Sequence, residues 1–335
     1  MEKAPVPYPP VLHSLASAST ITWLIHQKFE LSIPLYRQEK EWEALGLRLS
    51  RATMSNWLLV VYRDWLVHIV HRLKLELLKQ RYLHIDETHV QVLKEPGRKN
   101  TSDSYMWVYC SIRDAVNPIR YFEYQPGRSG KYPEAFLREY EGYIHTDAYS
   151  GYNAVSGVKR CLCYTHLRRA FVDALPKDIH NSEASKPAEA ILRLNQLFNI
   201  ESELEALPPD QKKKERLIRE RPLLEAFWSW AEKSAIGELP KSKLSKAFHY
   251  ALNNREGFWN YLEDGNCSIS NSLAENCIRP FVIGRKNWLF SGSPKGAEAS
   301  AGIYTLVETA KANGLAPMKY IKYILSDMPG SAFLE

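Results

Sequence analysis

The hydrophobic pattern of this chain changes its period once, near Tyr82, and that change limits the folds open to it. Between residues 18 and 83 the apolar side chains recur with the spacing of amphipathic helices. From Tyr82 the residues alternate between polar and apolar, which is typical of a half-buried strand, and two similar stretches follow. The pattern predicts an all-helical N-terminal region and then three successive strands, at residues 82–93, 104–112 and 118–124.

Helices and strands alternate in the rest of the chain. The pattern predicts a helix at 132–140, strands at 142–146 and 158–164, a leucine-spaced helical stretch at 178–265, and helices at 271–279 and 297–313. This order is typical of an α/β fold, in which a mixed sheet carries flanking helices and a helical insertion interrupts the domain. The predicted segments are a proline-rich linker at 1–15, a helical region at 16–80, the first part of the α/β domain at 81–177, the insertion at 178–265, and the second part of the domain at 266–328.

The composition is that of an ordinary globular protein. The 335 residues leave room for about two domains, and 45% hydrophobic with 24% charged residues argues against disorder. No apolar run is long enough to cross a membrane, and the N-terminus lacks a signal core, so we expect a soluble cytoplasmic protein with no membrane partner. The five cysteines are scattered and form no C-x-x-C pair, which predicts neither a disulfide framework nor a zinc finger.

Positive charge is concentrated in a few places, although the net charge is only +6. Residues 267–325 contain seven Lys or Arg and only three acids. The segment from Lys159 to Phe171 contains four cations and no acid. Clustered cations suit a phosphate backbone, while a solvated basic face is the alternative. The basic run at 212–216 is expected on the solvated face of an amphipathic helix.

Two helices separated by a short turn occupy residues 34–45 and the segment after Ser50. Gly46 is a good helix stop, and Ser50 is a good N-cap. This outline is typical of a helix-turn-helix, which would make 16–80 a DNA-binding region. Its second helix would present four side chains to a major groove: Arg51, Thr53, Ser55 and Asn56. The alternative is a plain helical hairpin that packs Trp42, Leu45, Met54 and Trp57.

Three acidic residues stand at positions that suggest chemistry. Asp86 lies inside an apolar strand, where a buried carboxylate needs a cation or hydrogen-bond donors. Asp147 directly follows a predicted strand, where ligands of α/β sheets gather, although it could instead cap the next short helix. Glu275 shares a helix face with Arg279, which also fits a simple ion pair at i, i+4 spacing.

A site for two metal ions would use all three carboxylates as ligands. Two divalent ions bring four positive charges, and three carboxylates with one phosphodiester bring four negative charges, so the loaded site is near neutral. Ligands that are all oxygen favour two Mg²⁺ ions, with Mn²⁺ as an alternative, over zinc. His84, His145 and His166 do not have zinc-ligand spacing and are expected to be structural or to contact phosphate.

Six segments of the chain form a recognisable series. They are Ile85-Asp86-Glu87-Thr88, Thr146-Asp147-Ala148-Tyr149-Ser150-Gly151-Tyr152, Thr165-His166-Leu167-Arg168-Arg169-Ala170-Phe171, Glu275-Asn276-Cys277-Ile278-Arg279-Pro280, Gly284-Arg285-Lys286-Asn287-Trp288-Leu289-Phe290-Ser291-Gly292-Ser293 and residues 301–311. Together these segments resemble the transposases of the insertion sequence 66 family. The resemblance runs from about Pro34 to Leu325, and its most specific part is the block from Gly284 to Ser293.

This resemblance implies a ribonuclease-H-like catalytic domain with Asp86, Asp147 and Glu275 as the DDE metal ligands. It implies a DNA transposase that cuts transposon ends and joins the freed 3′-OH to target DNA. Seven side chains would bind phosphates: His166, Arg168, Arg169, Arg279, Arg285, Lys286 and Lys295. The implied partners are the transposon ends, target DNA, further copies of the chain in a homodimer or larger assembly, and accessory transposition proteins, at the bacterial nucleoid.

Two other functions remain open at this stage. A ribonuclease-H-like nuclease would use the same three carboxylates without strand transfer. A decayed transposase would bind the ends as a regulator without cutting them. Family members commonly have Arg after the catalytic Glu, where this chain has Asn276, and usually carry a coiled coil and a zinc-binding segment before the proline-rich stretch. We therefore expect a shortened copy, whose activity the two departures put in question.

Overall fold

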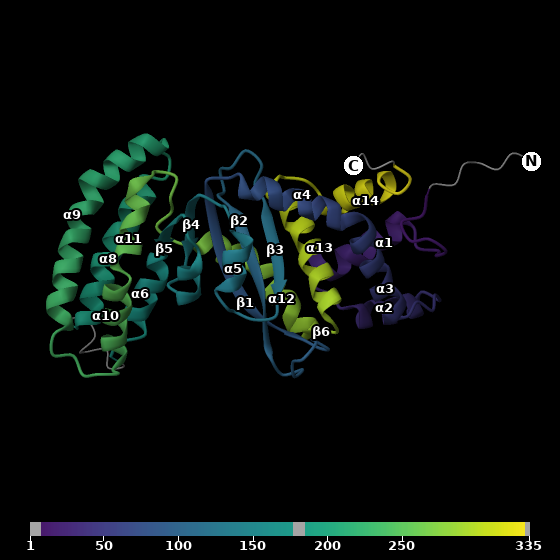
Figure 1. Ribbon diagram of the computed structural model, residues 1–335, viewed down its shortest axis with the longest axis horizontal. Helices are drawn as coiled ribbons and strands as arrows, with labels where there is room; N and C mark the ends of the chain where they lie inside the picture. The colour runs from purple at the N-terminus through teal and green to yellow at the C-terminus, as the bar shows by residue number, and fades with distance from the viewer. Residues whose placement is uncertain (1–7, 177–184, 332–335) are drawn as a thin grey trace, which may run out of the picture. The chain divides into compact units, whose positions relative to one another are not determined.

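The computed structural model describes residues 8–176 and 185–331, which form two compact units (Figure 1). Of the described residues, the first unit holds 8–80, 86–132 and 274–331, and the second holds 81–85, 133–176 and 185–273. Residues 1–7 of the predicted linker and residues 177–184, where the insertion was predicted to begin, lie outside the described residues. The segment boundaries predicted from the sequence stay a prediction.

A six-stranded mixed sheet has the strand order β3-β2-β1-β4-β5, with β6 paired to β1. β2 and β3 are antiparallel, whereas β1 with β4, β4 with β5, and β1 with β6 are parallel. The mixed α/β class predicted from the sequence is confirmed, and the ribonuclease-H-like topology stays a prediction. The strands are β1 (Tyr82–Val92), β2 (Asp103–Ser111), β3 (Arg120–Gln125), β4 (Gly142–Thr146), β5 (Val158–Leu162) and β6 (Phe290–Ser291).

Helices make up most of the first unit. The Ser50 side chain accepts a hydrogen bond from the Thr53 amide at 3.1 Å and caps α3, as predicted, and Gly46 after α2 has a φ of +86°, which favours glycine. The helices are α1 (Ala18–Ile25), η1 (His26–Glu30), α2 (Leu35–Ala44), α3 (Arg51–Val61), η2 (Tyr62–Leu66), α4 (Val67–Leu78), α12 (Ser272–Trp288), α13 (Pro294–Ala312) and α14 (Pro317–Asp327), while α5 (Lys131–Phe136) lies at the unit boundary.

α12 is longer than the helix predicted at 271–279, and the two-residue strand β6 follows it where a loop was expected. The helix continues through Pro280 because its apolar stripe does not end there: Ile278, Phe281 and Gly284 are all buried. Burial of this stripe outweighs the hydrogen bond that proline removes. Strand β6 is too short to show an alternating pattern in the sequence.

α13 packs beside β3, the strand at one end of the sheet, as Figure 1 shows. The amide of Phe122 donates to the Thr305 hydroxyl at 2.8 Å, and the amide of Arg120 donates to the Thr309 hydroxyl at 3.0 Å. Thr305 and Thr309 are one helical turn apart and so point the same way. Two outward-facing amides of the edge strand are thus bonded by a helix of the same unit.

The core of the first unit is organised around the buried ring of Tyr304 on α13. Phe29, Phe122 and Phe281 lie within 5.1 to 5.5 Å of it, measured between ring centroids, and Trp288 lies at 6.3 Å. A side chain at Gly284 would approach the Tyr304 hydroxyl to 2.6 Å, so only glycine fits there. These contacts fix α12 against α13.

The second unit combines strands β4 and β5 with a group of helices that Figure 1 shows gathered together. Its core includes Phe171, Phe227, Trp228 and Phe248, which are all fully buried. Its remaining elements are η3 (Ser150–Ala154), α6 (Tyr164–Val172), α8 (Lys186–Glu203), α9 (Pro209–Ala235), α10 (Lys243–Asn253), α11 (Arg255–Trp259) and η4 (Asn260–Glu263).

A buried ion pair joins α8 to α9 in the second unit. Arg216 is fully buried and holds both carboxylate oxygens of Glu201, at 2.6 and 2.8 Å. It also donates to the backbone carbonyls of Tyr261, Asp264 and Cys267 at 2.8 to 3.0 Å. The prediction that the basic run at 212–216 lies on a solvated face is therefore wrong for Arg216, because its guanidinium has five donors that internal acceptors can satisfy.

Glu220 lies beside this ion pair and accepts a hydrogen bond from the Tyr261 hydroxyl at 2.6 Å. Burial, helped by the negative charge of Glu201, raises the pKa of Glu220 to about 8. Folding thus holds a proton on this carboxyl that the unfolded chain releases at a pKa of about 4.5. The stability that Glu220 contributes is full below pH 4.5 and is lost as the pH rises through 8.

Among the described residues, no helix is both long enough and apolar enough to cross a membrane.

Glu220→Gln should remove this pH dependence. The uncharged amide still accepts from Tyr261, so we expect little change in the thermal midpoint at pH 5 and a midpoint about 5 °C above that of the unaltered protein at pH 9. Thermal unfolding followed by circular dichroism at several pH values measures this. Glu225→Gln, an exposed position on the same helix, is the control. An equal effect of both substitutions at pH 9 would contradict the assignment.

Candidate functional site

α12 carries the candidate Glu275 and a group of cations in the first unit. Its buried stripe faces the core, which leaves Glu275 half-buried and Arg279 and Lys286 exposed. Arg285 is half-buried and donates to the Thr88 hydroxyl on β1 at 3.2 Å. Partial burial lowers the pKa of Arg285 from its usual value. α12 is therefore fastened by a side-chain hydrogen bond to the strand that carries Asp86.

Asp86 lies in the middle of β1 and is half-buried. Residues two apart in a strand share a face, so Asp86 and Thr88 lie on the side that receives Arg285. Glu87 points the other way and forms an ion pair of 2.6 Å with Arg128. Asp86 and Glu275 thus lie on two elements of one unit that contact each other, and their role as metal ligands stays a prediction.

Asp147 belongs to the second unit and is the residue directly after β4. Its carboxylate accepts a hydrogen bond from the Tyr149 amide at 3.0 Å, which closes a tight turn. The side chain is half-buried. The alternative that the sequence left open, a cap on the next short helix, is not what this bond forms: η3 begins at Ser150 with Tyr149 as its N-cap and has no side-chain cap, so Asp147 closes the turn that precedes the helix. Convergence of Asp147 with Asp86 and Glu275 stays a prediction.

Arg160 on β5 holds the turn of Asp147, and sequence reasoning missed this role. Its guanidinium donates to the Thr146 hydroxyl at 2.7 Å and to the carbonyls of Asp147 and Tyr149 at 2.6 and 2.8 Å. β5 pairs in parallel with β4, and Arg160 lies opposite Ile144. From there the long side chain of Arg160 extends to Thr146 and to the turn that follows β4. No spacing in the sequence indicates this contact, because it depends on the register of two strands.

The cations between Lys159 and Phe171 do not form one basic patch. Lys159 forms an ion pair with Glu263, Arg160 is engaged with the turn, and Arg168 donates to Asn195 at 2.7 Å. The sequence showed no acid nearby because Glu263 is a hundred residues away along the chain. On α6, Arg169 is exposed while His166 and Arg168 are half-buried, so Arg169 is the most accessible of these three predicted phosphate contacts.

α3 presents all four of the predicted base-reading residues to solvent. Arg51, Thr53, Ser55 and Asn56 are exposed, whereas Met54, Leu58 and Val61 are buried. The Thr53 hydroxyl is already hydrogen-bonded to Ser50 at 2.9 Å, so it is less available to a ligand than the other three. The hairpin alternative is partly wrong, because Leu45 is 73% exposed.

A groove of about 950 Å³ in the first unit contains two of the predicted DNA contacts. Asn56 from α3 and Lys295 from the start of α13 both line it, although 239 residues separate them in the sequence. Its walls also carry Arg63 and Arg98, and three acids, Glu95, Glu123 and Glu298. Burial raises the pKa of Glu123, which favours its neutral form. The groove is therefore mixed in charge rather than uniformly basic.

Comparison with known proteins identifies one family. The family model described as "Transposase IS66 family" matches residues 13–299. Two uncharacterized proteins of Sinorhizobium fredii (strain NBRC 101917 / NGR234) are similar along nearly the whole chain. Protein y4hP is 25% identical over 97% of this chain and 62% of its own length, and protein y4qI is 28% identical over 93% and 59%.

The chain therefore spans about three fifths of the length of these curated relatives. A third protein of the same organism, y4jD, is 25% identical over 96% of this chain and 65% of its own length. No solved structure matches the chain.

Arg160→Ala should loosen the turn of Asp147. Two carbonyls would lose charged donors, so we expect a loss of about 1–3 kcal/mol in unfolding free energy. Amide hydrogen exchange at Tyr149 and Tyr152 should accelerate by about tenfold or more. Lys159→Ala is the control: this neighbour on β5 forms an exposed ion pair and should change stability by less than about 1 kcal/mol. Equal exchange in both variants would refute the role of Arg160.

Proposed function

Because this chain belongs to the IS66 family of transposases, we propose that it cuts transposon ends and joins the freed 3′-hydroxyl to target DNA. One observation supports this most directly. α12 carries Glu275 together with exposed cations, and it is hydrogen-bonded through Arg285 to the strand of Asp86. A carboxylate pair beside cations is an arrangement that suits phosphoryl transfer.

The donor set fits a magnesium centre. Asp86, Asp147 and Glu275 are half-buried carboxylates, and oxygen donors of this kind suit Mg²⁺ or Mn²⁺. In this proposal the three residues together hold two ions. When bound, the ions would activate water and stabilise the charge on the reacting phosphate. The convergence of Asp147 with the other two carboxylates is part of the proposal.

The side chains of the chain itself bind and orient the DNA. Arg279 and Lys286 on α12, with Lys295 at the start of α13, contact phosphates beside the carboxylates, and His166, Arg168 and Arg169 contact phosphates from α6. In the first step, water replaces the 3′ oxygen of the cut phosphodiester and leaves a free 3′-hydroxyl. In the second step, this hydroxyl attacks a target phosphodiester and displaces its 3′ oxygen.

End recognition is assigned to the exposed face of α3. Arg51, Ser55 and Asn56 are free to reach base edges in a major groove, and Thr53 supports the cap. Joining two ends in one event requires at least two copies on DNA, so a homodimer or larger assembly is part of the proposal. Accessory transposition proteins in the bacterial cytoplasm would complete the reaction.

Asp86→Asn or Glu275→Gln should abolish cutting of end DNA. Removal of one metal-binding carboxylate is expected to lower Mg²⁺-dependent cleavage by about 10³-fold or more, without loss of end binding. A labelled duplex that carries the transposon end reports cleavage and strand transfer on one gel. Glu225→Gln, an exposed position on α9 that belongs to no proposed site, is the control.

The same gel separates the proposal from its alternatives. Cleavage without joined product would favour a nuclease. Binding without any cleavage, with either Mg²⁺ or Mn²⁺, would favour a regulator, an outcome that the exposed Asn276 beside Glu275 makes worth testing. Cleavage that persists in Asp86→Asn would refute the catalytic assignment.

Asn56→Ala and Lys286→Ala should weaken DNA binding in different ways. Loss of a base contact is expected to cost about 1–3 kcal/mol on end DNA and little on random DNA. Lys286→Ala removes a phosphate contact, so it should weaken binding to end DNA and to random DNA equally. It should also reduce the slope of log K against log salt by about 1. Fluorescence anisotropy over a salt series measures both. An equal loss on both DNAs for Asn56→Ala would contradict base reading by α3.

A further inference from the structure

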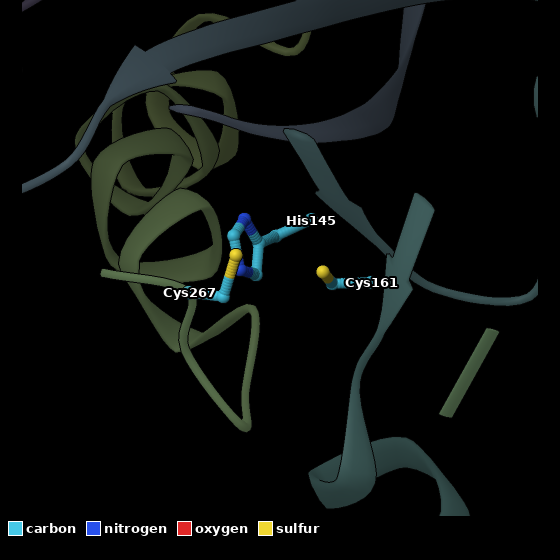
Figure 2. A group of neighbouring side chains, drawn as sticks. All are labelled: His145, Cys161 and Cys267. Atoms are coloured by element: carbon cyan, nitrogen blue, oxygen red, sulfur yellow. The ribbon is translucent and has the colours of Figure 1, made fainter. Parts of the chain in front are cut away.

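Three side chains of types that can bind a metal ion meet in the interior of the second unit. His145 lies on β4, Cys161 on β5, and Cys267 on the loop after η4. Each is about 1% exposed, and one ligand atom from each lies within 4.8 Å of the other two. Figure 2 shows the imidazole and both sulfur atoms turned toward one another. The transposase chemistry proposed above uses none of these residues.

The backbone of the unit fixes this arrangement. Parallel pairing of β4 with β5 places His145 directly opposite Cys161, so the two side chains leave the same face of the sheet. The loop of Cys267 is tied down twice: the Cys267 carbonyl accepts from the buried Arg216 at 2.8 Å, and its amide donates to Asp264 at 3.0 Å. The three residues are therefore held together by a sheet and a buried ion pair rather than by a flexible segment.

The hydrogen bonds of His145 fit the tautomer that a metal ligand needs. Its Nδ1 faces the Leu83 carbonyl at 3.3 Å, and its Nε2 accepts a hydrogen bond from the Ser268 amide at 2.8 Å. This pattern fits a neutral imidazole with the proton on Nδ1 and a lone pair on Nε2. Ligand histidines in proteins usually donate their other nitrogen to a carbonyl in this way. The ring also stacks on His84, with 4.2 Å between ring centroids.

We propose that His145, Cys161 and Cys267 bind one Zn²⁺ ion through Nε2 and two thiolates. Two sulfurs and one imidazole are ligands that zinc prefers, and they differ in kind from the oxygen donors of Asp86, Asp147 and Glu275. Two thiolates and one Zn²⁺ sum to zero charge, which makes burial of the complex inexpensive compared with burial of a net charge. The ion would replace the Ser268 amide as the partner of Nε2.

A second cysteine pair in the chain provides a matched comparison. Cys110 on β2 and Cys277 on α12 are hydrogen-bonded thiols in the first unit. Among the described residues, this pair belongs to no group of three potential metal ligands. If close thiols alone were sufficient, both pairs would bind the ion. The proposal assigns binding to the pair that has a histidine.

Titration of the reduced, metal-free full chain with Co²⁺ tests the site. Co²⁺ substitutes for Zn²⁺, and thiolate coordination gives a charge-transfer absorption band that carboxylate coordination does not give. We expect the band to saturate at one equivalent and to vanish when Zn²⁺ is added. Cys267→Ser and His145→Gln should weaken Co²⁺ binding by about 100-fold or more. Cys277→Ser should leave the band unchanged.

The Co²⁺ absorption band reports metal binding by thiolates and does not depend on transposase activity. Asp86→Asn should keep the band, because that carboxylate belongs to the other proposed metal centre. A reduced and folded protein without the band, or a band that survives in Cys267→Ser, would overturn the proposal. Circular dichroism checks the fold of each variant. If Cys267→Ser does not fold, the band of the unaltered protein and its response to His145→Gln decide.

Discussion

The packing of α12 against Tyr304 is the contact on which the candidate chemistry of the first unit depends. α12 carries Glu275 and the cations beside it, but a helix with an internal proline has little stability of its own. Tyr304 contacts Phe281 and Trp288 of that helix and Phe122 of β3. Since Gly284 leaves room for the tyrosine, the helix can approach closely enough for Arg285 to reach β1. The ring of Tyr304 thus helps to hold α12, with Glu275 and the cations beside it, against the sheet.

Local features of the fold were predictable, and features that depend on long-range packing were not. The cap at Ser50, the strand at 142–146 and the start of β1 follow from signals that span only a few residues. The burial of Arg216 could not be predicted, since a basic run looks the same on a solvated face as in a buried ion pair. The extension of α12 through Pro280 was missed because proline usually ends or kinks a helix. Here the buried apolar stripe continues past the proline and keeps the helix intact.

The same distinction applies to the candidate sites. The sequence singled out Asp86 and Glu275 by residue type and position; the structure places them on contacting elements of one unit, and their role in a metal site stays a prediction. Arg160 and the group formed by His145, Cys161 and Cys267 were missed, because both depend on which residues of β4 and β5 lie opposite each other. A spacing rule reads one segment at a time, so ligands from two strands and a distant loop leave no motif.

The side chains of α13 have a consequence for assembly. Thr305 and Thr309 occupy outward-facing amides of β3, the strand that ends the sheet on that side. An uncovered edge of this kind is a template on which a strand of another chain can form. With those two donors already satisfied, this edge is less available for strand addition. In the proposed assembly on DNA, copies of the chain are therefore expected to join through surfaces other than this edge, which can separate again without disturbing the strand.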